Sequence, residues 1–291
     1  MSDPIQPARP TQNWKLTLAY DGSAYRGWQV QPGEPTIQGE LQAALGRITS
    51  ERPLPQGSGR TDAGVHALAQ VASFALAARI PAVNLQRALN GKLPAAIRIL
   101  EARVVSGAFH ARHSAVAKTY EYRIFRGQIC PPWLAPYVYA CRWPLDLEAM
   151  CQAAGAFLGK HDFRSLAASD PDLAMRGAGP AAEPDAETDA GPEAPASTIR
   201  TIFSSAWEHG ATEAGDLLVY RVRGSGFLHH MVRNLVGTML DVGCGHLRAS
   251  QMEEILAARN RSKAGATAPA RGLFLHSVEY GGADGPAEAA F

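Results

Sequence analysis

The chain has 291 residues, 46% of them hydrophobic and 19% charged, so it is long enough for one or two domains and too apolar for wholesale disorder. With 28 Lys+Arg against 27 Asp+Glu, the formal net charge of +1 favours no class of partner. No apolar run reaches the roughly 18 residues of a membrane span, and the N-terminus lacks the basic start and apolar stretch of a signal peptide, so we expect a cytoplasmic protein.

The cysteines do not follow a metal-ligand pattern. They contain no CxxC pair and do not cluster with histidines, which argues against a disulfide scaffold and a structural zinc site. We expect four scattered core thiols, at Cys130, Cys141, Cys151 and Cys244.

A strand followed by a helix opens the chain. Residues 14–20 alternate between apolar and polar, as in a half-buried strand. Thr36 would cap a following helix, whose apolar face consists of Ile37, Leu41, Ala44, Leu45 and Ile48.

The same order recurs further along the chain. Tyr120, Tyr122 and Ile124 alternate as a strand, and Asp146 would cap a helix with an apolar face from Leu147 to Leu158 and with Gly159 at its end. The pattern favours two similar α+β halves divided near residue 107 over a doubly wound sheet. In a doubly wound sheet strands and helices alternate, whereas here strands also follow one another directly.

The strongest helix pattern covers residues 227–242, after a strand at 216–223 and a Gly-Ser-Gly turn. Its polar face would carry His229, His230, Arg233, Asn234 and Asp241. A capping box from Ser250 to Glu253 predicts a last helix, and residues 272–280 are expected to form a closing strand.

Residues 168–197 differ sharply in composition from the rest. They are almost entirely Ala, Pro, Gly and acids, which cannot bury enough apolar area to offset the entropy of ordering. We expect a disordered acidic insertion in a loop, and an acidic interaction arm is the alternative. The predicted organisation is therefore an N-terminal half at 1–107, a C-terminal half at 108–281 containing the insertion, and a loose tail at 282–291.

The insertion also changes the meaning of the net charge. It holds seven of the acids and one of the bases, so the rest of the chain has 27 basic and 20 acidic residues, a net charge of +7. The bases are 23 Arg and 5 Lys, a bias that suits bidentate phosphate contacts but that genomic base composition also produces.

The most unusual local sequence is GSGRTDAGVH at residues 57–66. Its glycines allow positive φ and close approach of a ligand, so the turn can present the Asp62 carboxylate without bulky neighbours. It matches neither a Walker A loop nor GxGxxG. The alternatives are a turn in which Asp62 only bonds nearby backbone, and a surface ion pair of Arg60 with Asp62.

Two further segments carry candidate residues. His229 and His230 are adjacent, so on a helix they point about 100° apart and form a poor metal pair; Arg233 one turn further on could bind phosphate or lie on a solvated face. Tyr120 and Tyr122 share one face of a strand, which suits core packing or, on an RNA-facing sheet, stacking of unpaired bases.

These three elements together resemble the tRNA pseudouridine synthase A family. The matching segments are GRTDAGVHA around Asp62, FHARHSAVAKTYEY around Tyr120 and GFLHHMVRNLVGTM around Arg233. YDGSAYRGWQVQPGEPTIQGELQAAL near the N-terminus, HDFRSL at 161–166 and RGLFLHSVEY at 271–280 also match. The resemblance covers residues 14–280, and the acidic insertion is longer than the family usually has.

The resemblance implies a pseudouridine-synthase-like fold, with two similar α/β halves and antiparallel sheets around a central cleft. It implies that the protein isomerises uridine to pseudouridine at positions 38, 39 and 40 of the tRNA anticodon stem-loop, as a homodimer without cofactor or metal. By the family pattern Asp62 is the nucleophile or base, Arg233 keeps it ionised, Tyr120 stacks on the flipped uracil, and Arg60 holds the nucleotide out of the helix.

Two other functions stay open from the residues alone. A non-catalytic protein that binds structured RNA would have the same bases and tyrosines without chemistry. A small-molecule hydrolase would use Asp62 as nucleophile, although no histidine stands in a recognisable triad with it.

Overall fold

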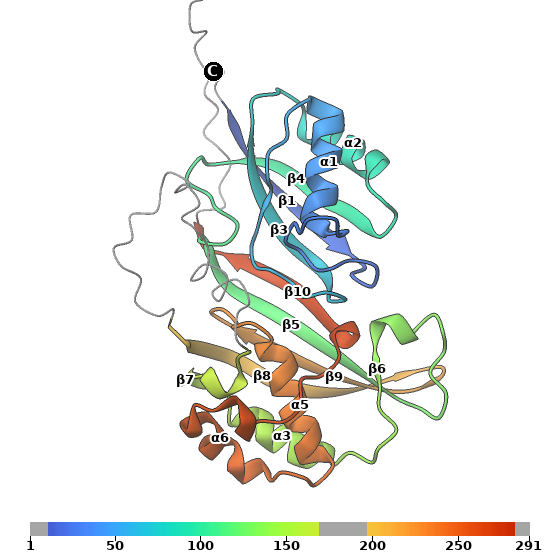
Figure 1. Ribbon diagram of the computed structural model, residues 1–291, viewed down its shortest axis with the longest axis vertical. Helices are drawn as coiled ribbons and strands as arrows, with labels where there is room; N and C mark the ends of the chain where they lie inside the picture. The colour runs from blue at the N-terminus through green and yellow to red at the C-terminus, as the bar shows by residue number, and fades with distance from the viewer. Residues whose placement is uncertain (1–10, 169–196, 283–291) are drawn as a thin grey trace, which may run out of the picture. The chain divides into compact units, whose positions relative to one another are not determined.

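The computed structural model describes residues 11–168 and 197–282 (Figure 1). Residues 169–196 of the predicted acidic insertion (168–197) and residues 283–291 of the predicted tail (282–291) lie outside the described residues. The strands are β1 (Gln12–Tyr20), β2 (Gln56–Gly57), β3 (His66–Leu76), β4 (Ile97–Val105), β5 (Ala115–Arg126), β6 (Tyr139–Ala140), β7 (Gly159–Asp162), β8 (Ile199–Thr212), β9 (Gly215–Gly224) and β10 (Leu273–Tyr280). The helices are α1 (Ile37–Thr49), α2 (Ala82–Lys92), α3 (Leu147–Gly155), α5 (Met231–Gly243) and α6 (Met252–Ala258).

The strands are hydrogen-bonded in the order β4-β1-β3-β10-β5-β9-β8-β7, with β2 added to β3 and β6 to β5. Strand β1 is antiparallel to both β3 and β4, and β10 is antiparallel to β5. The pairing of β10 with β3 is parallel. The predicted α+β fold with a largely antiparallel sheet is thus confirmed.

The chain divides into two compact units that each draw on several segments. The first unit contains residues 1–141, 209–221 and 269–291, and the second contains 142–208 and 222–268. Strands β8 and β9 contribute residues to both units. The expected similarity of the halves 1–107 and 108–281, and the cleft between them, stay predictions.

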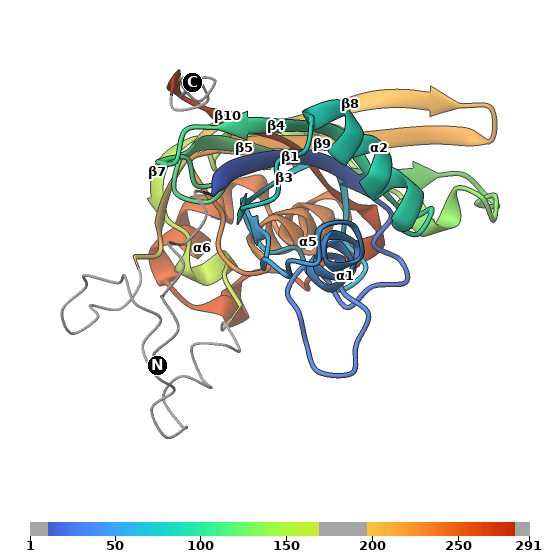
Figure 2. The ribbon, with the colours of Figure 1, turned by 90° about the horizontal axis from the view of Figure 1, so that it is seen from above.

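In the first unit, α1 covers one face of β1 and β3 (Figure 2). Trp14, Leu16 and Leu18 of β1 are fully buried, and Leu41 and Leu45 of α1 are buried with them. The predicted cap of α1 is present, since Thr36 Oγ1 accepts a hydrogen bond from Gly39 N at 3.3 Å. This packing makes β1 and β3 a rigid support for the loop that precedes β3.

The opposite face of β1 is covered by the segment between β4 and β5. Asn13 Nδ2 donates to the carbonyl oxygens of Ser106 and Phe109 at 2.9 and 2.8 Å. Lys15 is buried here, with its ammonium 4.5 Å from the ring centre of Tyr280 and 5.5 Å from that of Phe109. Phe109, the first residue of FHARHSAVAKTYEY, therefore packs on this face of β1.

In the second unit, α3 packs against α5. Asp146 caps α3 as expected, accepting a hydrogen bond from Ala149 N at 3.0 Å. The helix ends at Gly155 instead of continuing to Leu158, and Gly159 (φ 94°) opens β7.

Two expected helix starts in the second unit are wrong. Helix α5 begins at Met231 rather than 227, because His230 at its N-cap adopts a left-handed conformation (φ 58°). His229 and His230 therefore precede the helix, and Asn234 is buried instead of lying on a polar face. Helix α6 begins at Met252 after a 3-10 turn at Ala249–Gln251, so Ser250 is not its cap.

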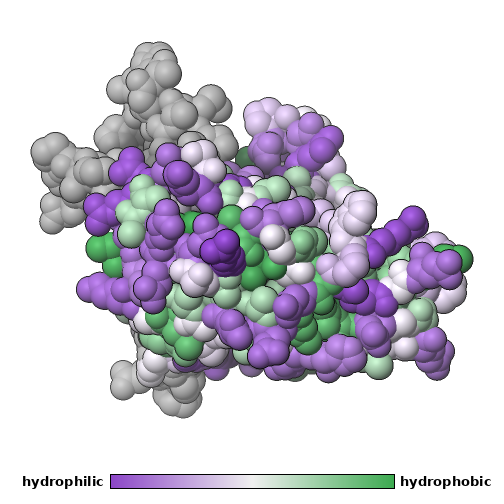
Figure 3. All heavy atoms as spheres, turned by 90° about the horizontal axis from the view of Figure 1, so that it is seen from below, coloured by the Kyte–Doolittle hydropathy of each residue, from purple (hydrophilic) through white to green (hydrophobic). Residues whose placement is uncertain are grey.

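The four cysteines are free thiols, but they do not all lie in the core. Cys141 is buried, whereas Cys151 is exposed on the outer side of α3, so the expectation of four core thiols is wrong. Figure 3 shows a face on which hydrophilic side chains predominate, with smaller hydrophobic areas among them. Among the described residues, no helix combines the length and apolar character needed to cross a membrane.

Candidate active site

The loop that carries Asp62 joins β2 to β3 in the first unit. It begins at Gly57, which pairs with Ala72 of β3. A Cβ on Gly57 would lie 2.6 Å from the ring of Trp28, so only glycine fits there. Gly64 has a φ of 77°, a left-handed conformation that favours glycine after Asp62. In GSGRTDAGVH, close packing therefore requires Gly57 and the backbone conformation favours Gly64.

Backbone hydrogen bonds hold the loop to residues 21–28. Trp28 N donates to Thr61 O at 3.0 Å, and Gly64 N donates to Tyr25 O at 3.3 Å. Val65 N donates to Asp62 O at 3.1 Å and closes the turn. The backbone on both sides of the Asp62 carboxylate is thus fixed.

The structure brings Asp62 and Tyr120 together. Asp62 is partly exposed, and Tyr120 on β5 is 8% exposed. Burial raises the pKa of the Tyr120 hydroxyl well above its usual value, and the neighbouring Tyr20 and Asp62 raise it further. The phenol next to the carboxylate therefore stays protonated at physiological pH.

The other two candidates in the first unit, Arg60 and Tyr122, differ in exposure. Arg60 is exposed two positions before Asp62, where its side chain can reach a ligand. Tyr122 is fully buried, and its hydroxyl donates to Pro269 O at 2.8 Å. The core-packing alternative therefore holds for Tyr122, and of the tyrosine pair only Tyr120 is a candidate for stacking.

Basic side chains of β5 also have defined partners. Lys118 Nζ donates to Ser58 O, which ties β5 to the start of the Asp62 loop. The buried Glu121 carboxylate accepts from Arg123 Nε at 2.7 Å and from Arg221 Nε at 2.9 Å. Burial acts to raise the pKa of Glu121, but these hydrogen bonds and charges outweigh it and hold the pKa below its usual value.

Arg233 lies in the first turn of α5, in the second unit. Its Nε donates to Ala268 O at 2.8 Å, and its own carbonyl accepts from Ala268 N at 3.1 Å. The rings of His229 and His230 lie 3.9 Å apart just before the helix. The expected pairing of Arg233 with Asp62 stays a prediction.

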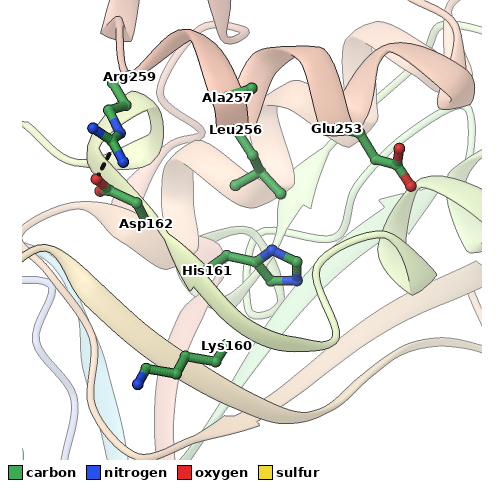
Figure 4. Close-up of a pocket in the computed structure, with 7 residues that line it drawn as sticks. All are labelled: Lys160, His161, Asp162, Glu253, Leu256, Ala257 and Arg259. Atoms are coloured by element: carbon green, nitrogen blue, oxygen red, sulfur yellow. Dashed lines mark ion pairs between the residues drawn. The ribbon is translucent and has the colours of Figure 1, made fainter.

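A cavity of about 530 Å³ in the second unit contains none of the predicted site residues (Figure 4). Across it, Asp162 of β7 pairs with Arg259 at 3.0 Å. Asp162 also accepts from Thr198 Oγ1 at 2.6 Å and from Arg164 N at 3.1 Å. The hydrogen bond from Thr198 is the main cause that lowers the pKa of Asp162. Asp162 in HDFRSL therefore joins elements of the second unit and is not a reactive group.

Tyr20 and Gln70, which lie behind the Asp62 loop, are not among the predicted site residues. The Tyr20 hydroxyl is 2.8 Å from Thr61 Oγ1, and Gln70 Nε2 donates to Gly59 O at 2.9 Å. One signal was available for Gln70, because it is the single amide within the mostly apolar segment HALAQVASFAL.

The chain is similar in sequence to known proteins over most of its length. Residues 17–114 and 186–281 match a family model described as tRNA pseudouridine synthase. A tRNA pseudouridine synthase A from Solibacter usitatus is 49% identical over 266 residues, which cover 91% of this chain and 98% of that protein. The chain belongs to the tRNA pseudouridine synthase A family.

Other members of the tRNA pseudouridine synthase A family align over nearly the same range. The protein of that name from Moorella thermoacetica is 43% identical over 91% of this chain and 98% of its own length. The one from Maridesulfovibrio salexigens is 40% identical over 93% of this chain and 91% of its own length. The resemblance indicated by the six sequence segments is therefore confirmed.

Proposed function

We propose that this protein isomerises uridine to pseudouridine at positions 38, 39 and 40 of the tRNA anticodon stem-loop. The observation that carries the proposal is the Asp62 loop beside Tyr120, in a chain that aligns with nearly the full length of its family relatives. The reaction breaks the bond from ribose C1′ to uracil N1 and forms the bond from C1′ to C5, while the proton on C5 is replaced by one on N1.

The residues of the first unit suit this reaction. Asp62 acts as the nucleophile or base in the step that detaches uracil. The Tyr120 ring stacks on the flipped base and keeps the detached uracil in place, and Arg60 holds the nucleotide out of its helical stack. By the family resemblance, Arg233 is the positively charged partner of the Asp62 carboxylate.

The test is release of tritium from C5-labelled uridine in unmodified, transcribed tRNA. We expect the wild-type protein to release tritium and Asp62→Asn to lose about 1,000-fold or more of the rate, because the amide is neither a nucleophile nor a base. Asp146→Asn is the matched control, since asparagine caps a helix as well as aspartate does. An Asp62→Asn protein with a rate comparable to the wild type would refute the assignment.

The same assay separates the alternative function. A non-catalytic protein for structured RNA would bind the tRNA and release no tritium at any enzyme concentration. The family resemblance further supports a homodimer that holds each tRNA across both subunits in the cytoplasm. Sedimentation of the purified protein tests the dimer, with an expected mass of twice the 31.0 kDa of one chain.

A further inference from the structure

A fully buried amide, Gln70 of β3, lies at the centre of the hydrogen bonds that hold the Asp62 loop. Gln70 Oε1 accepts from Ser58 Oγ at 2.6 Å and from Val71 N at 3.1 Å. Gln70 Nε2 donates to Gly59 O at 2.9 Å and to the Tyr20 hydroxyl at 3.5 Å. One side chain therefore contacts two consecutive residues of the loop.

The partners of Gln70 fix the orientation of its amide. Gly59 O can only accept a hydrogen bond, so the nitrogen of the amide must face it, and Val71 N can only donate, so the oxygen must face that side. A carboxylate has no donor for Gly59, and an apolar side chain has neither group. The site thus requires a side chain with both a donor and an acceptor, which the primary amide of Gln70 supplies at every physiological pH.

The hydrogen bonds continue from Gln70 to the residue before Asp62. Burial raises the pKa of Tyr20 to about 12, so its hydroxyl keeps its proton. Gln70 Nε2 donates to the phenol oxygen, and the same hydroxyl forms a hydrogen bond with Thr61 Oγ1, 2.8 Å away. Gln70 therefore acts directly on Ser58 and Gly59 and, through Tyr20, on Thr61.

We infer that Gln70 is a positioning residue for the proposed isomerisation. It contacts neither substrate nor reacting atoms. It holds the loop on both sides of Arg60 and next to Asp62, so that the carboxylate occupies one place when the nucleotide arrives. A reacting group displaced by about 1 Å costs on the order of 100-fold in rate. The inference rests on the proposed function, and its test separates the two.

Two substitutions at Gln70 and one at Tyr20 test the inference. Gln70→Leu removes both polar groups. Gln70→Glu keeps the size but, when ionised, places an oxygen against Gly59 O. When protonated, the glutamic acid donates to Gly59 O and accepts from Ser58 Oγ, and burial raises its pKa toward neutral pH. Tyr20→Phe keeps the ring against Trp28 and removes only the hydroxyl.

The measurements are the single-turnover rate with saturating enzyme, the affinity for tRNA by filter binding, and the melting temperature. We expect the rates of Gln70→Leu, and of Gln70→Glu at pH 8, to be about 10- to 100-fold lower than that of the wild type. The tRNA affinity of both variants should stay within about 3-fold of the wild type, because phosphate contacts dominate it. From pH 8 to pH 6, the rate of Gln70→Glu should recover relative to the wild type at the same pH. Tyr20→Phe should lose a smaller part of the rate without a change in affinity.

Gln38 of α1 is the matched control, because it is also a buried amide with backbone partners on both sides. Its Oε1 accepts from Val30 N and its Nε2 donates to Pro55 O, both at 2.9 Å, so neither hydrogen bond involves a residue of the Asp62 loop. Gln38→Leu and Gln38→Glu should lower the melting temperature as the Gln70 variants do and leave the rate unchanged.

Three results would overturn the inference: Gln70 variants with wild-type rates, Gln38 variants with an equal loss of rate, or a Gln70→Glu rate that does not recover at low pH. If Gln70→Leu fails to fold, the pH dependence of Gln70→Glu and the rate of Tyr20→Phe decide. If the wild-type protein releases no tritium from tRNA, the proposed function fails first.

Discussion

At the scale of single residues, the ring of Tyr120 is buried, and its hydroxyl lies beside Asp62 and stays protonated. If the ring acts by stacking, Tyr120→Phe should keep the tritium-release rate within about 10-fold of wild type. Tyr120→Ala should lose roughly 100-fold, because base–aromatic stacking is worth about 1–3 kcal/mol.

Tyr122→Phe is the control for Tyr120, because it removes only the hydrogen bond to Pro269 O. It should cost about 1 kcal/mol of unfolding free energy and leave the rate unchanged. A Tyr120→Phe protein that is as slow as Tyr120→Ala would assign the hydroxyl to proton transfer.

His66, four residues after Asp62, makes stability depend on pH. Its Nδ1 accepts from Gly22 N and its Nε2 donates to Pro136 O, each at 3.1 Å, so the folded protein holds the neutral ring. Burial lowers the pKa of His66 more than the nearby Asp21 raises it. Below a pH of about 6.5, the His66 ring therefore binds a proton more readily in the unfolded chain than in the folded protein.

The unfolding free energy should accordingly fall as the pH decreases from 7.5 to 5.5, as measured by urea titration. Glutamine can accept from Gly22 and donate to Pro136, so His66→Gln should show a smaller fall over the same range. His246→Gln, at an exposed position, is the control. Equal falls in the wild type and in His66→Gln would contradict this account.

The sequence predicted the candidate site residues better than the buried residues that hold the Asp62 loop. Asp62, Arg60 and Tyr120 could be proposed as site residues because they stand in the segments that resemble the family motifs. Gln70 could not, because its role depends on which atoms of Ser58, Gly59 and Tyr20 face it in space. The apolar periodicity of a sequence predicts which residues are buried, but not the direction in which their hydrogen-bond donors and acceptors point.

At the scale of elements, the packing of helix α5 depends on how closely residues 261–268 approach it. A Cβ on Gly237 would overlap the carbonyl of Ala266. Gly91 in α2 has open space around its Cβ position. Gly237→Ala should therefore lower the unfolding free energy by about 3 kcal/mol or more, whereas Gly91→Ala should raise it by up to about 1 kcal/mol. Urea denaturation of both variants checks this contrast, and a neutral Gly237→Ala would refute it.

Elements with a clear apolar period and a polar cap were predictable. Helices α1 and α3 had both, with Thr36 and Asp146 as caps. Strand β3 was not predicted, because it is buried on both faces over most of its length and shows no alternation. The start of α5 was misplaced because Leu228 continues the helical spacing, while the left-handed His230 leaves no signal in sequence.

At the scale of the whole molecule, the uneven charge predicts how the protein binds tRNA. Residues 168–197 hold seven acids and one base, and the rest of the chain has a net charge of +7. Deleting these residues should keep or strengthen tRNA affinity at low salt, because the repulsion between their acids and the phosphates is removed.

Filter binding at two salt concentrations tests the deletion. The difference between the deletion variant and the full chain should shrink at high salt, because screening weakens exposed charges. A large loss of affinity at low salt would show that the acidic segment takes part in binding.

The place of β10 in the sheet has a consequence for biosynthesis. Residues 273–280 come last among the described strands, yet they pair with β3 on one side and β5 on the other. During translation, β3 and β5 emerge long before the strand that joins them, so the edges that pair with β10 stay unpaired until residues 273–280 have been made. A polypeptide that stops before residue 273 lacks the strand that lies beside Tyr120 and cannot complete the sheet of the unit that holds Asp62.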